Sequence, residues 1–343
     1  MVPTVEFEIV QGDIRSFDAD VVALKHAQAF FGADQAVANA LSQAGEATDS
    51  LRVKPGAYRY IETRGSIRAH HALFVGVPPI LEFGYQDISE FAASVLSILS
   101  TEAPSTRRLA MTIHGVGFGL DEVEALLSEF RGCVRGIQQT DAAPVDLERI
   151  SVIDRNNDRV ERLKQVLGQR LAHAEYAVRG ESGWAIRRRM GHAALILDLE
   201  DVWGLPKAKP VEKPHAFVAM PFKKEMDDVF YYGIQGPVRA AGLLCERIDQ
   251  EAFTGDILDR VRKKIEGAAV VIADLSDANP NVYLEVGYAW GKGRPTVLLV
   301  KDPQELRFDV RGQRCLTYAR IKDLEESLTK ELDELVTKGL VHL

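Results

Sequence analysis

Apolar and polar residues alternate along the chain in a pattern that predicts short strands separated by helices. In the N-terminal half, short apolar runs predict strands at 5–10, 21–24, 72–77, 109–113 and 150–153. Longer amphipathic stretches predict helices at 34–44, 88–100, 120–138 and 157–171. Because strands and helices alternate, the fold class is expected to be a layered α/β fold.

The same alternation is clearer near the C-terminus, where the apolar runs are nearly continuous. Strands are predicted at 216–220, 243–248, 269–273 and 296–300. Helices are predicted at 225–241 with a break near Pro237, at 256–266 and at 281–292. Continuous apolar strands indicate a parallel sheet that is covered on both faces, and ligands of such sheets bind at the carboxyl ends of the strands.

The chain has 343 residues, and a single hydrophobic core rarely serves more than about 250–300, so two domains are expected. The segment 204–214 holds three prolines and several charges, which predicts a linker. Just before it, 184–190 has the pattern of an amphipathic helix. We therefore divide the chain into a nucleotide-binding domain at 1–175, a bridging helix and linker at 176–214, and a second α/β domain at 215–343.

Composition and charge narrow the classes of function. Hydrophobic residues make up 46% and the net charge is −8, so a soluble protein that does not bind nucleic acid is expected. No apolar stretch is long enough to predict a membrane span. Three scattered cysteines indicate a reducing compartment, and no metal-ligand spacing occurs. We expect a cytoplasmic protein without a bound metal or cofactor, and a homo-oligomer is left open.

Two carboxylates of the second domain are candidates for chemistry. Asp274 directly follows the apolar strand at 269–273, and Glu285 lies in the next predicted helix. Asn281, beside Pro280, is a plausible N-cap, which would place Glu285 near the positive end of the helix dipole as an ionised carboxylate. A pair of carboxylates at one sheet edge suits cleavage of a glycosidic bond.

Each of these residues also has an ordinary structural interpretation. An aspartate at a strand end commonly caps a loop, and a glutamate in a helix is commonly solvated. The flanking residues Leu284 and Val286, however, predict a semi-buried Glu285, which favours a site. Met220, Pro221 and Phe222 follow the first strand of this domain, where they could form a wall against a nucleobase or belong to the core.

Four segments of the second domain resemble the nucleoside 2-deoxyribosyltransferase superfamily over about residues 215–320. These segments are 217–222, 273–275, 279–289 and 293–295. The resemblance implies a flavodoxin-like parallel α/β fold with Glu285 as the nucleophile and Asp274 as the residue that positions the substrate. It places the other substrate contacts at Met220, Pro221, Phe222, Asn281 and Tyr288. A more distant likeness to TIR domains, some of which cleave NAD, keeps NAD among the substrates.

The first domain carries a different resemblance. The segments 10–14 and 17–24 resemble the opening of a macro domain, a three-layer α/β module that binds ADP-ribose. Later, 111–120 leaves a strand through three glycines, a turn whose N–H groups suit phosphate oxygens at a helix N-terminus. The resemblance implies that Asp13, followed by Ile14, contacts adenine. It implies a diphosphate loop made of Gly115, Val116, Gly117, Phe118 and Gly119, although a glycine-rich turn also serves as a plain strand-to-helix connection.

Two functions therefore stay open on sequence alone. In the first, a nucleotide-sensing protein cleaves the N-glycosidic bond of a nucleoside, a nucleotide or NAD, by hydrolysis or by transfer. In the second, both domains bind nucleotides without catalysis and the output is signalling. The expected partner in both is a small nucleotide, similar to ADP-ribose or NAD.

Overall fold

The chain forms two compact units in a computed structural model, and each is described separately. The N-terminal unit comprises Met1–Val116 and Glu122–Pro210, and the C-terminal unit comprises Gly117–Asp121 and Val211–Leu343. The structure describes residues 4–80, 82–116, 118–139, 143–172, 174, 177–188, 213–221, 223–248 and 257–343. The predicted linker at 204–214 falls outside these residues apart from Lys213 and Pro214. Within the described ranges, no helix has the length and apolar character that a membrane crossing needs.

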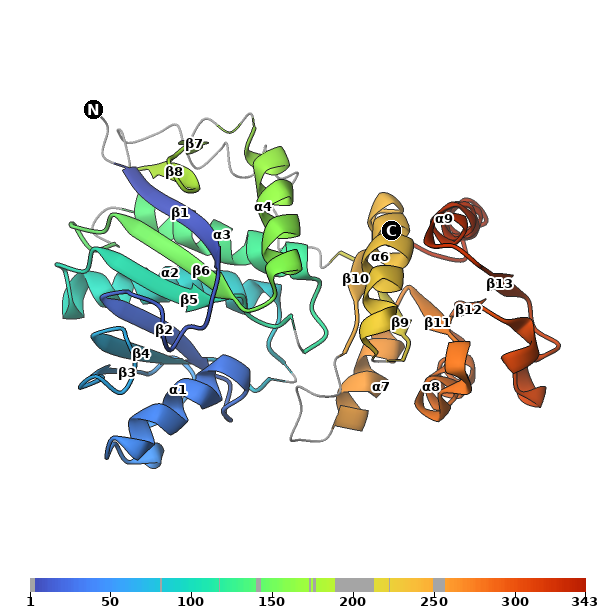
Figure 1. Cartoon of the computed structure of the whole chain (residues 1–343), viewed down its shortest axis with the longest axis horizontal. Coiled ribbons are helices and arrows are strands. Elements are labelled where there is room, and N and C mark those ends of the chain that lie inside the picture. The colour runs from blue at the N-terminus through green and yellow to red at the C-terminus, as the bar shows by residue number, and fades with distance from the viewer. Residues whose placement is uncertain are drawn as a thin grey trace. The chain divides into compact units, whose positions relative to one another are not determined.

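The N-terminal unit is built on an eight-stranded mixed sheet in the order β3-β4-β2-β5-β6-β1-β8-β7 (Figure 1). Its strands are β1 (Thr4–Gln11), β2 (Val21–His26), β3 (Tyr58–Glu62), β4 (His71–Gly76), β5 (Arg108–Thr112), β6 (Arg149–Asp154), β7 (Ala177–Arg179) and β8 (Trp184–Arg187). The five strands from β4 to β1 are parallel, whereas β3 and the β8-β7 pair run antiparallel at the two edges.

Helices cover both faces of this sheet and give the three layers predicted from the sequence. They are α1 (Gly32–Gln43), α2 (Tyr85–Glu102), α3 (Glu122–Gln138) and α4 (Asn157–Leu171). One core cluster joins Val37 and Leu41 of α1 to Leu24 of β2 and Phe74 of β4. On α3, Phe130 packs edge to face against Phe7 of β1, with ring centroids 5.0 Å apart.

The segment 184–190 corrects one sequence-based prediction. Trp184–Arg187 forms strand β8 rather than an amphipathic helix, and Arg189 and Met190 fall outside the described residues. Trp184 and Ile186 are both buried, and Ile186 lies opposite Val5 in an antiparallel ladder with β1. Pairing along the free edge of β1 therefore decides the local structure, because a weak local helix pattern yields to hydrogen bonding with a strand.

The C-terminal unit is a five-stranded parallel sheet in the order β10-β9-β11-β12-β13, the strand order of flavodoxin-like folds. Its strands are β9 (His215–Ala219), β10 (Leu244–Glu246), β11 (Val270–Asp274), β12 (Thr296–Val300) and β13 (Cys315–Thr317). Its main helices are α6 (Gln235–Ala240), α7 (Ile257–Gly267), α8 (Pro280–Gly291) and α9 (Ile321–Thr337). Both faces are covered, which confirms the predicted α/β class.

Side chains of the buried strands alternate between two separate cores. Val270 and Ile272 of β11 pack into the core that includes helix residues Val238 of α6 and Leu328 of α9. Val271 and Ala273 pack into the core formed with α7 and α8. Because successive side chains of a strand point to opposite faces, the continuous apolar runs in the sequence are explained by two buried faces.

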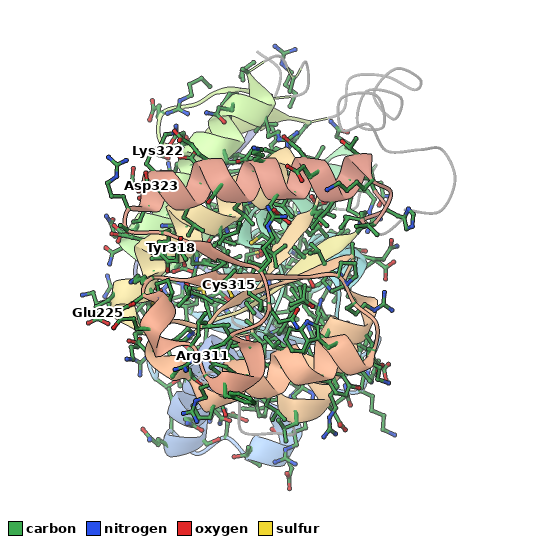
Figure 2. The ribbon with its side chains drawn as sticks, turned by 90° about the vertical axis from the view of Figure 1, so that its right-hand side faces the viewer. Glu225, Arg311, Cys315, Tyr318, Lys322 and Asp323 are labelled. Atoms are coloured by element: carbon green, nitrogen blue, oxygen red, sulfur yellow. The ribbon has the colours of Figure 1, made fainter. Side chains whose placement is uncertain are left out.

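Strands β3, β7 and β13 and helix α9 were not predicted from the sequence, and a helix break was expected near Pro237. β13 has only three residues and α9 is polar on its exposed side; Figure 2 shows this edge of the sheet. The chain continues through a π-helical turn at Val229–Ile234 into α6 without a break at Pro237. A proline has no N–H to donate, and the wider turn just before it accommodates that missing bond.

A buried ion pair stabilises the N-terminal unit beside β2. Lys25 Nζ lies 2.6 Å from Asp34 Oδ2, and the two side chains are only 6% and 4% exposed. Asp34 stands in the first turn of α1, where a negative charge also interacts favourably with the helix dipole. Removing Asp34 takes this ion pair away from a buried ammonium group.

Asp34→Ala is therefore expected to lower the free energy of unfolding of the N-terminal unit by about 3–5 kcal/mol. Chemical denaturation of the full chain measures this. Asp49→Ala is the control, because Asp49 is 93% exposed and its Arg52 partner lies 3.7 Å away, and it should cost at most about 1 kcal/mol. Equal losses in the two variants would contradict a special contribution from the buried pair.

Candidate active site

Helix α8 carries the central side chain of the site, and its start is fixed by two residues. Asn279 is the N-cap, and its side-chain oxygen accepts a hydrogen bond from the Asn281 N–H at 3.0 Å. Pro280 occupies the first turn, where its missing N–H has no cost. The N-cap is therefore Asn279 and not Asn281 as predicted, so that Glu285 lies in the second helical turn.

A cavity of about 330 Å³ lies between helices α7 and α8. Each helix lines it with residues at i, i+3, i+4 and i+7, the spacing of one helix face. From α7 these are Leu258, Val261, Arg262 and Ile265, and from α8 they are Asn281, Leu284, Glu285 and Tyr288. Three predicted site residues thus meet in one cavity, where the walls are mainly apolar.

Glu285 is a carboxylic acid in a desolvated setting. Its side chain is half-buried, and among the described residues it makes no hydrogen bond or ion pair. Burial raises the pKa of Glu285 from its ordinary value near 4.5 to about 7. The sequence predicted an ionised carboxylate near the helix N-terminus; in the second turn the effect of burial outweighs the dipole, which falls off within the first turn.

Asp274 is held by a network at the carboxyl end of β11. Its side chain is fully buried, accepting the Tyr318 hydroxyl at 2.5 Å and the Ser276 N–H at 3.0 Å. Ser276 Oγ in turn accepts the Lys301 N–H at 3.0 Å. Tyr318 follows β13 and lies at that edge of the sheet in Figure 2. Burial raises the pKa of Asp274, and the network joins the turns after β11, β12 and β13.

The turn between Asp274 and α8 adopts an unusual backbone conformation. Asp277 and Ala278 have φ values of 62° and 46°, a left-handed region that residues other than glycine rarely adopt. Asp277 also lies 3.0 Å from Lys223 Nζ in an exposed ion pair. Strained backbone of this kind persists only where surrounding contacts impose it, and here it leads from the Asp274 network into the helix that carries Glu285.

Of the other predicted substrate contacts in the C-terminal unit, the described ones either lie outside the cavity or already form a hydrogen bond within the protein. Met220 and Pro221 are buried, and Met220 belongs to the core on the α6 and α9 face, whereas the cavity lies on the α7 and α8 face. Neither residue nor Asp274 lines the cavity. Phe222 lies outside the described residues. The hydroxyl of Tyr288 donates to Glu266 at 2.6 Å.

Arg262 is a cavity residue that the sequence analysis did not single out. It lies on the exposed side of α7, paired loosely with Asp259 at 3.4 Å. Among basic residues of a charged helix, nothing in the sequence distinguishes the one that borders a cavity. Arg262 is identified only by the tertiary structure, in which α7 packs opposite α8.

In the N-terminal unit, Asp13 follows β1 and forms ion pairs with two arginines. Arg15 Nη2 lies 2.8 Å and Arg155 Nη2 lies 2.6 Å from its Oδ2 atom. The hydrogen bonds from Arg15 are the largest influence, and they hold the pKa of Asp13 far below its usual range. The next residue, Ile14, is 2% exposed and packs in the core. An adenine at Asp13 would have to share the carboxylate with these guanidinium groups.

The glycine-rich turn after β5 divides between the two units. Gly115 and Val116 belong to the N-terminal unit, Gly117 lies outside the described residues, and Phe118 and Gly119 belong to the C-terminal unit. Gly115 and Gly119 have φ values of 81° and 91°, so both positions favour glycine. The sequence placed all five residues in the first domain.

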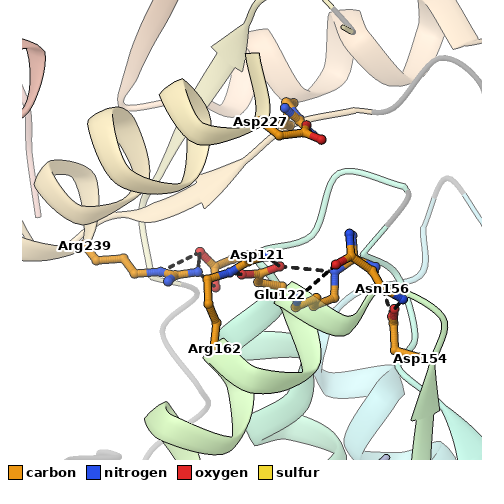
Figure 3. Close-up of polar contacts among 9 residues, drawn as sticks. Asp121, Glu122, Asp154, Asn156, Arg162, Asp227 and Arg239 are labelled. Carbon is orange, nitrogen blue, oxygen red and sulfur yellow. Dashed lines mark hydrogen bonds and ion pairs between the residues drawn. The ribbon is translucent and has the colours of Figure 1, made fainter. Parts of the chain in front are cut away.

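At the end of this turn, two consecutive acidic residues have partners in different units. Asp121 accepts hydrogen bonds from Arg239 of α6, at 3.0 Å for the closest pair of atoms, within the C-terminal unit. Glu122 begins α3 and pairs with Arg159 and Arg162, each at 3.2 Å, within the N-terminal unit. Figure 3 shows these polar contacts.

No protein-family model and no curated protein sequence matches the chain. Solved structures to which the chain is similar include a Trypanosoma brucei macrodomain in complex with ADP-ribose, at 12% identity and a TM-score of 0.39, covering 48% of this chain and 69% of that one. A Clostridium botulinum CMP N-glycosidase has 18% identity and a TM-score of 0.28, covering 33% and 97%. A bottromycin maturation enzyme with manganese has 13% identity and a TM-score of 0.28, covering 92% and 90%.

The raised pKa of Glu285 predicts a stability that depends on pH. The folded chain keeps this proton up to about pH 7, whereas the unfolded chain loses it near pH 4.5. The contribution of Glu285 to the free energy of unfolding is therefore fully present below pH 4.5 and is lost as the pH rises through 7. Glu285→Gln removes the buried charge. The variant should be more stable than the wild type at pH 8, by roughly 3 kcal/mol or less, and equal to it near pH 4.

Thermal denaturation of both proteins across this pH range is the measurement. Glu285 and its neutral replacement have nearly the same size, so packing changes should contribute equally at every pH. A stability difference that is the same at pH 4 and pH 8 would contradict a desolvated carboxylate at this position.

Proposed function

We propose that the C-terminal unit cleaves the N-glycosidic bond of a nucleoside, a nucleotide or NAD, with Glu285 as the nucleophile. The observation that carries the proposal is a half-buried carboxylate without a described partner, in an apolar cavity, with a pKa raised to about 7. A purely structural carboxylate at this depth would be expected to have a hydrogen-bond partner. Desolvated acids of this kind cluster at functional sites.

The chemistry follows from the charge of the ionised form. A carboxylate without hydrogen bonds is poorly solvated and is therefore available to attack or stabilise a sugar carbon as the base departs. Apolar side chains of α7 and α8, among them Leu258 and Val261, offer surface to a flat base or sugar. Water completes the reaction in a hydrolase, and a second base completes it in a transferase.

Asp274 has a positioning role in this proposal. Its carboxylate is occupied by Tyr318 and Ser276, so it acts on the substrate through the turn that leads to α8. Asn281, which lines the cavity one turn before Glu285, is the described residue best placed to hydrogen-bond a sugar hydroxyl. The alternative function is nucleotide binding without turnover.

Glu285→Gln should lower the rate of base release by about a thousandfold or more, because the nucleophile loses its charge. Chromatography of reactions with NAD and a panel of nucleosides and nucleotides measures it, and substrate binding should persist. For the wild type, kcat/KM should rise with pH towards a plateau above about 7, since only the ionised form attacks.

The control is Asp277→Asn, which removes a nearby acidic charge but not one in the cavity. Its ion pair with Lys223 is exposed, and asparagine tolerates the left-handed backbone at this position. Undiminished base release by a folded Glu285→Gln protein would exclude the mechanism. Absence of base release by the wild type with every substrate would favour the binding module.

For the N-terminal unit we propose binding of an ADP-ribose-like nucleotide. Two features support it: the carboxylate of Asp13 lies just beyond the carboxyl end of β1, and the turn at Gly115 follows β5 of the same sheet, separated from β1 by β6 alone. Nucleotides bind at the carboxyl ends of parallel strands in α/β folds. The arginines at Asp13 add positive charge that would suit a phosphate.

ADP-ribose should raise the melting temperature of the protein by mass action, and Asp13→Ala should weaken binding by about ten- to a hundredfold through loss of an adenine hydrogen bond. Thermal shift titration measures both. Asp18→Ala is the control, since Asp18 is a second carboxylate of this unit that is paired with arginines, Arg68 and Arg108, and is more exposed than Asp13. No shift at millimolar ADP-ribose, or equal weakening by both variants, would contradict the assignment.

A further inference from the structure

Among the described residues that line the Glu285 cavity, Tyr288 is the one aromatic side chain, and two charged residues hold it in place. Its hydroxyl donates a hydrogen bond to Oε1 of Glu266 on α7 at 2.6 Å. Lys292, at the end of α8, has its Nζ 2.6 Å from the same oxygen and 5.4 Å from the centre of the Tyr288 ring. We call Tyr288, Glu266 and Lys292 the tyrosine clamp.

Glu266 acts in the clamp as an ionised acceptor. The hydrogen bonds from Lys292 and Tyr288 lower the pKa of Glu266, so it is a carboxylate at neutral pH. Hydrogen bonds to a charged acceptor are roughly twice as strong as those between neutral groups. The side chains of Lys292 and Glu266 are 46% and 43% exposed, so their ion pair adds little to stability. Its effect is geometric, because it fixes the oxygen to which the Tyr288 hydroxyl is bound.

The ring of Tyr288 lies between the protein core and the cavity. Part of its surface packs against the core that lies on the α7 and α8 face of the sheet, and another part lines the cavity. Because the hydroxyl is already bound, the side chain offers aromatic surface to a ligand in place of a hydrogen bond. A ring that is held in one orientation loses little side-chain freedom when a second flat ring packs against it.

The cavity side of α8 carries three different chemical groups in a fixed order. Asn281, Glu285 and Tyr288 present an amide, a carboxyl group and an aromatic ring. With the rise of an α-helix, these residues are spaced by about 6 Å and about 4.5 Å along the helix axis. A nucleoside has a matching order of groups, with sugar hydroxyls, then the anomeric carbon, then a flat base.

We propose that the substrate lies along α8 with its base against Tyr288 and its sugar towards Asn281, and that Glu266 is the positioning residue that holds the Tyr288 ring for the base. This inference rests on the proposed function and deepens it, because it assigns selection of the base to the tyrosine clamp. Glu285 then faces the anomeric carbon, where the bond between sugar and base breaks. Asn281 contacts the sugar hydroxyls.

Kinetics of base release from adenosine and cytidine 5′-monophosphates and their 2′-deoxy forms test the assignment. Glu266→Ala and Tyr288→Phe each remove the hydrogen bond and keep the ring. Each should raise KM roughly two- to tenfold, the worth of one aromatic contact, and leave kcat within about twofold. The double variant should show no further rise, because both changes break the same bond. Glu266→Gln keeps an oxygen for the hydroxyl and should restore most of the affinity.

The preference among the four compounds distinguishes positioning from a structural effect. Variants of Glu266 and Tyr288 should change the preference between adenine and cytosine and keep the preference between ribose and deoxyribose, whereas Asn281→Ala should do the reverse. Glu334→Ala is the matched control. Glu334 forms a similarly exposed ion pair with Lys338, at 3.1 Å, and lies on α9, which packs on the other face of the sheet. This variant should change neither KM nor the preferences.

Calorimetric binding of the same four compounds keeps the test independent of turnover. If no base is released but the dissociation constants follow the expected pattern, the proposed function fails and the assignment of the clamp stands. The assignment is overturned if a folded Glu266→Ala protein binds all four compounds as the wild type does, or if the effects of Glu266→Ala and Tyr288→Phe add. It is also overturned if these variants change the sugar preference, or if none of the compounds binds.

Discussion

The C-terminal unit depends on a constraint that every buried charge must satisfy: it needs hydrogen bonds or a counter-ion, or it gives up its charge. Asp274 meets this constraint with the Tyr318 hydroxyl and the Ser276 N–H, and through Ser276 it fixes the turn after β12. Glu285, in the second turn of α8, has no described partner, and burial raises its pKa instead. The two carboxylates thus show the two possible responses to burial.

This contrast separates a rigid frame around Asp274 from a side chain, Glu285, whose pKa is raised. Asp274 and its partners hold the strand ends together, and the left-handed backbone at Asp277 and Ala278 is imposed by that frame. These contacts fix the position of the N-cap of α8. Asn281 and Glu285 on this helix then line the cavity between α7 and α8. Residues that keep an unsatisfied acid in position lower the stability of a protein, a cost that active sites commonly carry.

The boundary between the units follows packing and not sequence order. A domain is expected to be continuous, yet Phe118–Asp121 belongs to the C-terminal unit. Asp121 is held by Arg239, whereas the adjacent Glu122 is held by Arg159 and Arg162. Two consecutive residues, Asp121 and Glu122, therefore belong to different structural units. Because arginines need acceptors, the carboxylate of Asp121 can complete the surface of the C-terminal unit.

The sequence by itself determined the α/β class, most strands and helices of the two sheets and the location of Glu285 on the helix that follows a strand-end aspartate. These features depend on local periodicity and on the turn residues, which short stretches of sequence encode. Strands β3, β7 and β13 were not predicted and β8 was misjudged. For β8 and β13 the reason is that they pair with partners distant in the sequence, β1 and β12.

Only the tertiary structure decided which polar groups meet. Arg262 borders the cavity because α7 and α8 face each other, whereas Met220 lies on the opposite side of the sheet. In the N-terminal unit, Arg15 and Arg155 form ion pairs with Asp13. The degree of burial, and with it the pKa of Glu285, likewise depends on packing between helices that are separated by a strand. Hydrophobic periodicity specifies which face of a helix or strand is buried. The partner of a polar side chain, its distance and the degree to which it is desolvated are set by the packing of elements that are remote in the sequence.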